Sequence, residues 1–261
     1  MLNQIVETIR QQVAVRKLSH PLDSLTLQPG TFAFSHALAT TGWALIAECK
    51  LASPSKGRLC QTHTVPELAQ IFTANGATAL SVHTSTPFLG KLEDIADVRA
   101  VSPLPILRKD FIIDEYQVYE ARAAGADAIL LIAAILDDAG LNRYLATARS
   151  LGMDCLVEVH NPPELERVRQ TRASIVGINN RDLTTFSTDI TNTFQLLPHC
   201  DPRWRIISES GIHDAADARR LQKSGVKGIL VGESLVRATD IAALTRALAT
   251  PEITKRGNQH A

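Results

Sequence analysis

The chain of 261 residues is 45% hydrophobic and 21% charged, and its 27 basic side chains balance 27 acidic ones. A chain of this length can bury one large core, in one or two domains. The formal net charge of zero disfavours a nucleic acid or a membrane surface as a partner, because the chain has no excess positive charge to attract these anionic partners.

Cysteine usage and the length of the apolar runs indicate a cytoplasmic protein without a membrane anchor. The four cysteines are Cys49, Cys60, Cys155 and Cys200, and they have neither metal-binding nor CxxC spacing. Met1–Lys17 has no apolar segment of the kind found in signal peptides, and the longest apolar run, Ala128–Leu136, is too short to span a bilayer. We therefore expect reduced thiols and no metal site.

The first part of the chain is predicted to be a helical extension. Its apolar residues, which recur at helical spacing, are Leu2, Ile5, Val6, Ile9 and Val13. A connection containing Pro, Ser, Thr and Gly follows, and then a short segment at residues 32–39. We expect residues 1–43 to pack on a catalytic barrel at residues 44–250 and to help close its cleft. Residues 251–261 are expected to be a polar C-terminal tail.

From residue 44 onward, an apolar strand, a loop, an amphipathic helix and a turn follow one another repeatedly. The predicted strands are Ala44–Lys50, Ala79–His83, Pro105–Asp110, Asp127–Ile132, Asp154–Val159, Ile175–Asn180, Arg205–Glu209 and Gly228–Gly232. The predicted helices are Val65–Ala74, Leu92–Val101, Asp114–Ala124, Asp138–Ser150, Pro163–Thr171, Thr191–Leu197, Asp214–Lys223 and Leu235–Leu248. Four glycines that each follow a helix, as C-terminal caps do, are Gly76, Gly125, Gly152 and Gly225.

Eight strands that alternate with eight helices indicate parallel βαβ units. An open doubly wound sheet is the rival, but its Gly-rich fingerprint is absent after Ala44–Lys50. We therefore predict the α/β class, as a single (β/α)₈ TIM barrel with an N-terminal helical extension.

The stretch Pro105–Ile113 places three charges directly after an apolar strand. Side chains alternate across a strand, so Lys109 shares a face with Leu107 and Phe111. A lysine on an apolar face can act as a proton donor. The alternative is a structural salt bridge between Lys109 and its neighbour Asp110.

Charged and amide side chains also end four other predicted strands. Together with Lys109 they are Glu48, Lys50, Glu158, Asn179, Arg181 and Glu209. Active sites in this fold are built at the carboxyl ends of the strands. Unpaired buried charges are costly, so a set of this size indicates a site more than a structural feature.

The last two strands run into glycine-containing turns, Ser208–Ile212 and Val231–Leu235. Phosphate is commonly bound there in barrels, by backbone N–H groups and a helix N-terminus. These turns predict a small phosphate ester as the substrate. The polar loop Ala52–Gly57 is either a lid over the cleft or simply a long connection.

Several longer segments have a distinctive residue order: Ile46–Lys50, Ala52–Gly57, Ala79–Val82, Pro105–Ile113, Tyr119–Asp127, Leu156–Val159, Val176–Leu183, Ser208–Ile212 and Leu230–Leu235. They cover nearly the whole barrel and resemble the indole-3-glycerol phosphate synthase family of tryptophan biosynthesis. The resemblance implies a lyase without cofactor. It would convert 1-(2-carboxyphenylamino)-1-deoxy-D-ribulose 5-phosphate to indole-3-glycerol phosphate, carbon dioxide and water.

By this resemblance, Lys109 is the general acid that protonates the ribulose carbonyl oxygen, and Glu158 is the general base of the dehydration. The implied catalytic residues are Lys109, Glu158, Glu48, Lys50 and Asn179. The implied substrate-binding residues are Ser53, Phe88, Phe111, Arg181, Glu209, Ser210, Gly211, Gly232 and Ser234. Whether Lys109 or Lys50 donates the proton at each step stays open. The implied ligand is a phosphorylated aromatic small molecule, and we expect a monomer, with contacts to neighbouring pathway enzymes left open.

The sequence departs from the family pattern in three places. Leu51 replaces a common basic residue, His83 stands where an aliphatic residue is usual, and the loop Thr84–Gly90 is shorter. The assignment of Phe88 depends on the alignment of that loop. These departures leave the implied acid and base in place.

Two other functions are compatible with parts of the sequence. Phosphoribosylanthranilate isomerase would need Cys49 and Asp182 as its acid–base pair. Side chains alternate along a strand, however, so both residues should point away from the face of Lys50 and Arg181. A non-catalytic paralogue that only binds the same ligand is the second alternative, and the joint presence of the implied acid and base argues against it.

Overall fold

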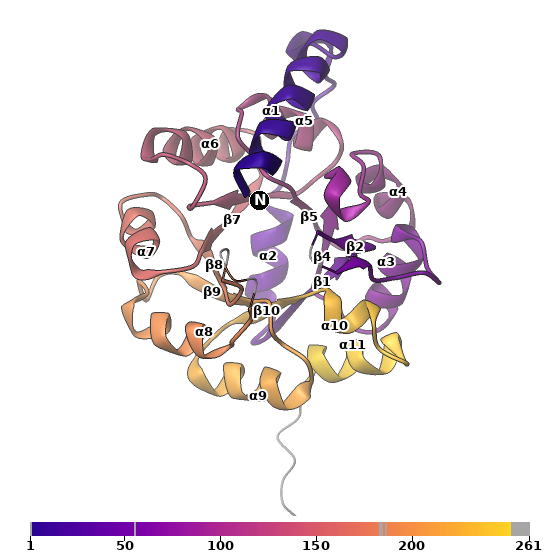
Figure 1. Cartoon of the computed structure of the whole chain (residues 1–261), viewed down its shortest axis with the longest axis vertical. Coiled ribbons are helices and arrows are strands. Elements are labelled where there is room, and N and C mark those ends of the chain that lie inside the picture. Colours follow the sequence, from indigo (N-terminus) through magenta and orange to yellow (C-terminus); the bar gives the residue numbers. More distant parts are fainter. Residues whose placement is uncertain (1, 55, 183–184, 186, 252–261) are drawn as a thin grey trace, which may run out of the picture.

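Eight parallel strands close into one barrel in the computed structural model, which describes residues 2–54, 56–182, 185 and 187–251 (Figure 1). Around the barrel the strands are β1 (Ala44–Cys49), β10 (Gly228–Val231), β9 (Arg205–Glu209), β8 (Ile175–Asn179), β7 (Asp154–Val159), β6 (Ala128–Ile132), β5 (Ile106–Lys109) and β4 (Ala79–His83). The (β/α)₈ TIM barrel that the sequence predicts is confirmed. Within the expected lid loop, β2 (Ala52–Ser53) pairs antiparallel with β3 (Gly57–Arg58).

The helices that surround the barrel are α3 (Val65–Ala74), α4 (Asp94–Val101), α5 (Tyr116–Ala123), α6 (Asp138–Ser150), α7 (Pro162–Arg169), α8 (Thr191–Leu196), α9 (Ala215–Ser224), α10 (Glu233–Val236) and α11 (Ile241–Ala249). The prediction of one helix over Leu235–Leu248 is wrong. The chain leaves α10 at Arg237, and the side chain of Asp240 accepts a hydrogen bond from the Ala243 N–H, which starts α11 as a new helix. The four cap glycines all have positive φ.

Alternation along each strand creates two apolar layers, one inside the barrel and one between the strands and the helices. On β5, Leu107 belongs to the interior layer together with Ile46 and Leu156. Its neighbour Ile106 belongs to the outer layer, with Phe72 of α3. The face of each strand-end side chain is therefore fixed by the residues that precede it.

A short helix closes the bottom of the barrel. This helix, α2 (Ala33–Thr40), crosses the centre of the view in Figure 1. Its Phe34 and Leu38 are fully buried in the interior layer, below the residues that will form the site. The backbone just before it is tied to the end of α6 by hydrogen bonds from Gly30 to Leu151 and from Phe32 to Gly152.

The first helix, α1 (Leu2–Ser19), lies against α5 at the rim of the barrel (Figure 1). Ile9 and Val13 are buried there with Tyr116. Arg16 donates a hydrogen bond to Glu120 at 2.6 Å, so a charge joins the extension to the barrel. Two 3₁₀ helices, η1 (Leu22–Ser24) and η3 (Leu197–His199), lie in connections. The C-terminal tail expected at 251–261 lies outside the described residues after position 251.

Arg108 is the largest fully buried side chain of the barrel wall, with 1% of its surface exposed. Its guanidinium donates to Glu120 at 2.8 Å, to Asp110 at 3.1 Å and to the Gln117 carbonyl at 3.1 Å. Asp110 is therefore occupied by Arg108, and the proposed salt bridge between Lys109 and Asp110 is wrong. Because side chains alternate along β5, Arg108 and Asp110 point toward the outside of the barrel and Lys109 points toward its interior.

No helix in the described part of the chain is both long enough and apolar enough to cross a membrane.

Replacing Arg108 by Met should destabilise the fold strongly, because Glu120 and Asp110 would keep buried charges without their main partner. Breaking a buried ion pair in this way costs about 3–5 kcal/mol, which urea denaturation would measure. Arg203→Met is the matched control, since the Arg203–Asp201 pair lies at the surface and should contribute little. Equal stability losses in the two variants would contradict this role of Arg108.

Candidate active site

A cavity of about 400 Å³ opens at the carboxyl ends of the strands. All fourteen site residues expected from the sequence line it: Glu48, Lys50, Ser53, Phe88, Lys109, Phe111, Glu158, Asn179, Arg181, Glu209, Ser210, Gly211, Gly232 and Ser234. Residues that the sequence reasoning did not assign to the site also line it, and among them are Ile5, Lys56, His83, Leu130, Leu230 and Glu233. Of these, Ile5 comes from the extension helix α1.

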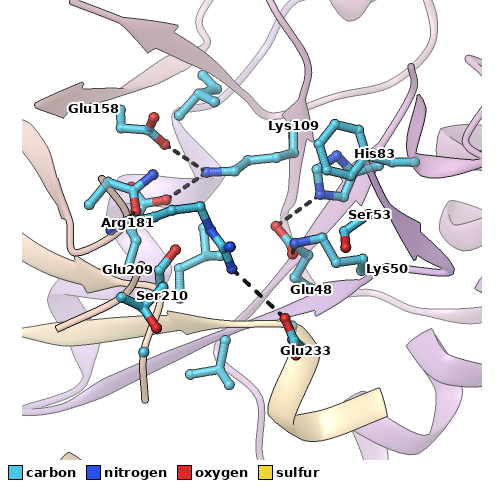
Figure 2. Close-up of a pocket in the computed structure, with 18 of the residues that line it drawn as sticks. Glu48, Lys50, Ser53, His83, Lys109, Glu158, Arg181, Glu209, Ser210 and Glu233 are labelled. Atoms are coloured by element: carbon cyan, nitrogen blue, oxygen red, sulfur yellow. Dashed lines mark hydrogen bonds and ion pairs between the residues drawn. The ribbon is translucent and has the colours of Figure 1, made fainter. Parts of the chain in front are cut away.

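The centre of the cavity is an ammonium group between two carboxylates (Figure 2). Lys109 Nζ donates a hydrogen bond to Glu158 Oε2 at 3.1 Å and another to Glu209 Oε2 at 2.6 Å. The lysine ends β5, and the two glutamates lie on β7 and β9. Three alternate strands of the barrel therefore contribute to this group, as alternate strands do when they build a side-chain layer in this fold.

Burial and pairing act in opposite directions on these three groups. Burial works against the ammonium of Lys109, but Glu209 and Glu158 outweigh it and raise the pKa of Lys109. Burial also disfavours the Glu158 carboxylate, yet Lys109 and His160 hold the pKa of Glu158 far below its usual range. For Glu209, burial prevails over the attraction of Lys109 and raises the pKa to about 7. Lys109 is thus charged at neutral pH, and the next proton to enter the cluster goes to Glu209.

A histidine contacts the oxygen of Glu158 that does not bind Lys109. His160 Nε2 lies 3.3 Å from Glu158 Oε1, and its Nδ1 lies 3.0 Å from Glu164 Oε2 on α7. Burial opposes the charge on this ring, but the contacts with Glu158 and Glu164 raise the pKa of His160 to about 10. The ring is therefore a cation that keeps Glu158 ionised and oriented.

A second group of polar side chains surrounds Glu48, at the end of β1. Lys50 Nζ lies 2.9 Å from Glu48 Oε1, and His83 Nε2 lies 3.1 Å from Glu48 Oε2 (Figure 2). Burial disfavours the carboxylate, but Lys50, His83 and Lys109 hold the pKa of Glu48 well below its usual range. The expectation that Glu48 and Lys50 share one face is confirmed. The 3₁₀ helix η2 (Thr86–Phe88) places the ring of Phe88 beside this group.

The turn after β9 holds an unusual backbone conformation. Ser210 has φ of 66° and Gly211 has φ of 73°, and such positive values are rare for a residue with a side chain. The buried amide of Asn180 donates at 3.0 Å to the Ser210 carbonyl, and its oxygen accepts from Thr193 N and Oγ1. The left-handed turn is thus held by a buried polar network, as a pre-organised binding loop requires.

At two glycine positions of the wall, an added side chain would displace a buried carboxylate of the site. A Cβ at Gly232 would collide with Glu48 Oε1, and a Cβ at Gly177 would collide with Glu209 Oε1. In the described part of the chain, the backbone N–H groups of Gly211 and Gly232 donate to no protein acceptor. Two donors at adjacent strand ends are therefore available to an anionic ligand.

Glu233 joins two loops across the mouth of the cavity. Its carboxylate lies 2.5 Å from Lys56 Nζ, in the loop after β1. It also lies 3.8 Å from Arg181, in the loop after β8 (Figure 2). Burial disfavours this carboxylate, but Lys56 and Arg181 together outweigh it and lower the pKa of Glu233. The sequence reasoning missed Glu233 because its position between Gly232 and Ser234 gave no sign of partners so distant in the chain.

The alternative acid–base pair does not meet in the structure. Cys49 is buried in the outer layer, and Asp182 lies in an exposed loop. Over the described residues, no three His, Cys, Asp or Glu side chains are arranged so that they could hold a metal ion.

The fold and the cavity define a TIM-barrel enzyme with paired acids and bases at the carboxyl ends of its strands. A sequence model of the family described as indole-3-glycerol phosphate synthase matches residues 2–248. The chain belongs to this family. Its function is the carbon–carbon lyase reaction of tryptophan biosynthesis that forms indole-3-glycerol phosphate, as the resemblance implied.

Curated relatives share much of the sequence. The indole-3-glycerol phosphate synthase of Desulforamulus reducens is 46% identical over 239 residues, which is 90% of each chain. That of Legionella pneumophila is 44% identical over 257 residues, covering 95% of this chain and 100% of the relative. Among solved structures, 3-hexulose-6-phosphate synthase from Salmonella typhimurium superposes with a TM-score of 0.65 and 16% identity. It covers 80% of this chain and 97% of its own, and this likeness shows the fold alone.

The buried carboxyl of Glu209 should make stability depend on pH. Its pKa rises from 4.5 to about 7 on folding, so its proton stabilises the fold fully below pH 4.5, and this contribution is lost as pH rises through 7. Against Glu209→Gln, the parent should therefore lose on the order of 3 kcal/mol between pH 4.5 and 8 in urea denaturation.

Glu166→Gln, on the exposed side of α7, is the matched control for this titration. A pH dependence that both variants share cannot come from the loss of the Glu209 carboxyl. A pH-independent difference between the parent and Glu209→Gln would show that Glu209 titrates alike in the folded and unfolded chains.

Proposed function

We propose that Lys109 is the general acid of the ring closure and that Glu158 is the general base of the following dehydration. The observation that carries this assignment is the pair of hydrogen bonds from Lys109 Nζ to Glu158 and Glu209 inside the cavity. The group combines a proton donor and a proton acceptor within reach of one bound molecule. The substrate is 1-(2-carboxyphenylamino)-1-deoxy-D-ribulose 5-phosphate.

In the first step, the aryl carbon that carries the carboxylate attacks the ribulose carbonyl carbon. The carbonyl oxygen gains negative charge, and Lys109 supplies a proton to it. Pairing with Glu158 and Glu209 keeps this proton on Lys109 until the developing oxyanion competes for it. The carboxyl group then leaves as carbon dioxide, and its bonding electrons return to the ring system.

The second step removes the hydroxyl group as water and makes the indole ring aromatic. A base must take a proton from the ring system while an acid protonates the leaving hydroxyl. Glu158 is available as the base because Lys109 and His160 keep its carboxylate ionised despite burial. Lys50, whose ammonium lies 2.9 Å from Glu48, is the alternative acid for this step.

The rest of the cavity provides binding. Gly211 and Gly232 offer backbone N–H groups to the phosphate, and Ser210 and Ser234 lie beside them. The rings of Phe88 and Phe111, whose centroids are 6.4 Å apart, form an apolar wall for the carboxyphenyl group. Asn179 and Arg181, at the end of β8, supply polar contacts between these two ends, and Ser53 lines the cavity beside β1.

Replacing Lys109 by Met should lower kcat by about 10²–10⁴-fold, the range expected for loss of a general acid. Binding of the substrate should stay within about tenfold, because the phosphate loops are not altered. Indole fluorescence measured without added metal or cofactor would follow turnover, and single-turnover experiments would separate binding from chemistry.

Two further lysine variants serve as a control and as a test of the alternative acid. Lys91→Met is the matched control, because Lys91 is 62% exposed and does not line the cavity, and it should keep the parent kcat. Lys50→Met tests the other candidate acid. If Lys109→Met turns over within a few-fold of the parent, the assignment fails and Lys50 becomes the acid.

A further inference from the structure

His83 is a titratable side chain in the cavity wall to which the proposed reaction gives no part. It is the last residue of β4, and 5% of its surface is exposed. Its ring meets two other components of the site. Nε2 lies 3.1 Å from Glu48 Oε2, and the ring stacks on Phe88 with centroids 4.1 Å apart and planes 10° apart.

These two contacts connect parts of the site that the backbone does not join. Glu48 is the second-last residue of β1, whereas Phe88 lies in η2, inside the loop after β4. Lys50 completes the arrangement, since its ammonium lies 2.9 Å from Glu48 Oε1 and 5.5 Å from the centroid of the Phe88 ring. The imidazole therefore lies between a buried carboxylate and an aromatic wall, and an ammonium group bridges the same two partners.

The protonation state of His83 follows from its partners. In the described structure Nδ1 has no polar partner, and Nε2 lies 3.1 Å from Glu48 Oε2 without the alignment of a full hydrogen bond. A doubly protonated ring would therefore leave a buried N–H unpaired. The favoured form is neutral, with its one proton on Nε2 facing Glu48. Burial lowers the pKa of His83 and outweighs the attraction of Glu48, which agrees with a neutral ring at pH 7.

We propose that His83 is a positioning residue of this active site, which orients the Glu48 carboxylate through Nε2–H and holds the Phe88 ring by stacking. The proposal rests on the proposed function, because there Glu48 is the partner of Lys50, the alternative acid, and Phe88 is part of the wall for the carboxyphenyl group. Without the imidazole, Glu48 keeps Lys50 as a partner at one oxygen only, and its carboxylate can rotate. Phe88 loses the surface that fixes its plane.

The two contacts have separable consequences. The Nε2–H group of His83 should govern the ionisation of Glu48. The other titratable groups that face Glu48 are Lys50 just after β1, Lys109 on β5 and Glu209 on β9. Burial disfavours the Glu48 carboxylate, and loss of the His83 donor would remove one of the contacts that lower the pKa of Glu48. The ring should govern the placement of Phe88 and therefore KM.

Three variants at position 83 separate these effects. Gln keeps a donor at the place of Nε2 but no ring, Phe keeps a ring but no donor, and Leu keeps neither. We expect His83→Leu to lower kcat/KM by about 10- to 100-fold, the range for loss of a hydrogen bond to a charged group. KM should rise in the Leu and Gln variants. The acid limb of the kcat–pH profile should move to higher pH in the Leu and Phe variants only.

Two outcomes would overturn the role of His83. If all three variants keep the parent KM and the parent acid limb, the ring only fills space. If all three lose activity equally, with a lower Tm and an unmoved acid limb, the residue acts in stability alone. Lys109→Met, assayed alongside, keeps the two proposals distinguishable, because activity in that variant refutes the proposed acid whatever the position-83 variants do.

Discussion

The ammonium of Lys109, held between the buried carboxylates of Glu158 and Glu209, is the interaction on which the active end of the barrel depends. Each of these carboxylates would carry a large desolvation cost without a cation nearby. One nitrogen joins β5 to β7 and β9, which are not neighbours in the sheet. The ammonium that neutralises the two acids also carries the proton that can be donated to a substrate. Stability and chemistry therefore depend on one group.

Around this centre, the buried charges on β1 and β5 are paired as well. Glu48 is paired with Lys50 and His83, and Arg108 neutralises Asp110 and Glu120 on the outer side of the same strand that carries Lys109. The outer network fixes β5 from behind and continues to the extension helix through Arg16. Because the outward-facing Arg108 network holds β5 in place, the inward-facing Lys109 can serve the active site.

Much of this arrangement could be predicted from the sequence, because strand alternation is a local property. Apolar runs located all eight strands, and parity placed Lys109 on the inner face and Arg108 on the outer face. Partners could not be predicted in the same way. Glu158 and Glu209 lie 49 and 100 residues from Lys109 in the chain, so the nearby Asp110 seemed equally suitable as its partner. The break between α10 and α11 was missed because the apolar pattern continues through Asp240.

The loops were the least predictable part, since their contacts depend on how several turns meet above the barrel. The ion pair of Lys56 with Glu233 joins loops that follow different strands, and His83 at the end of β4 stacks on Phe88 in the loop that follows it. No periodic pattern marks such contacts. The left-handed turn at Ser210 was predicted only as a glycine-containing loop, and its support by Asn180 depends on a side chain that the sequence marks merely as polar.

The most direct test of this account is a pH titration of the lysine side-chain nitrogens by NMR, with Lys109 identified by the signal that Lys109→Met loses. Burial alone would favour the neutral amine, whereas pairing with Glu209 and Glu158 raises the pKa of Lys109. The account therefore expects the Lys109 ammonium to persist at pH values where exposed lysines have lost their proton, above about 10.4. A Lys109 amine that deprotonates below that value would contradict the account, because the central group would then be a base and not the proton donor.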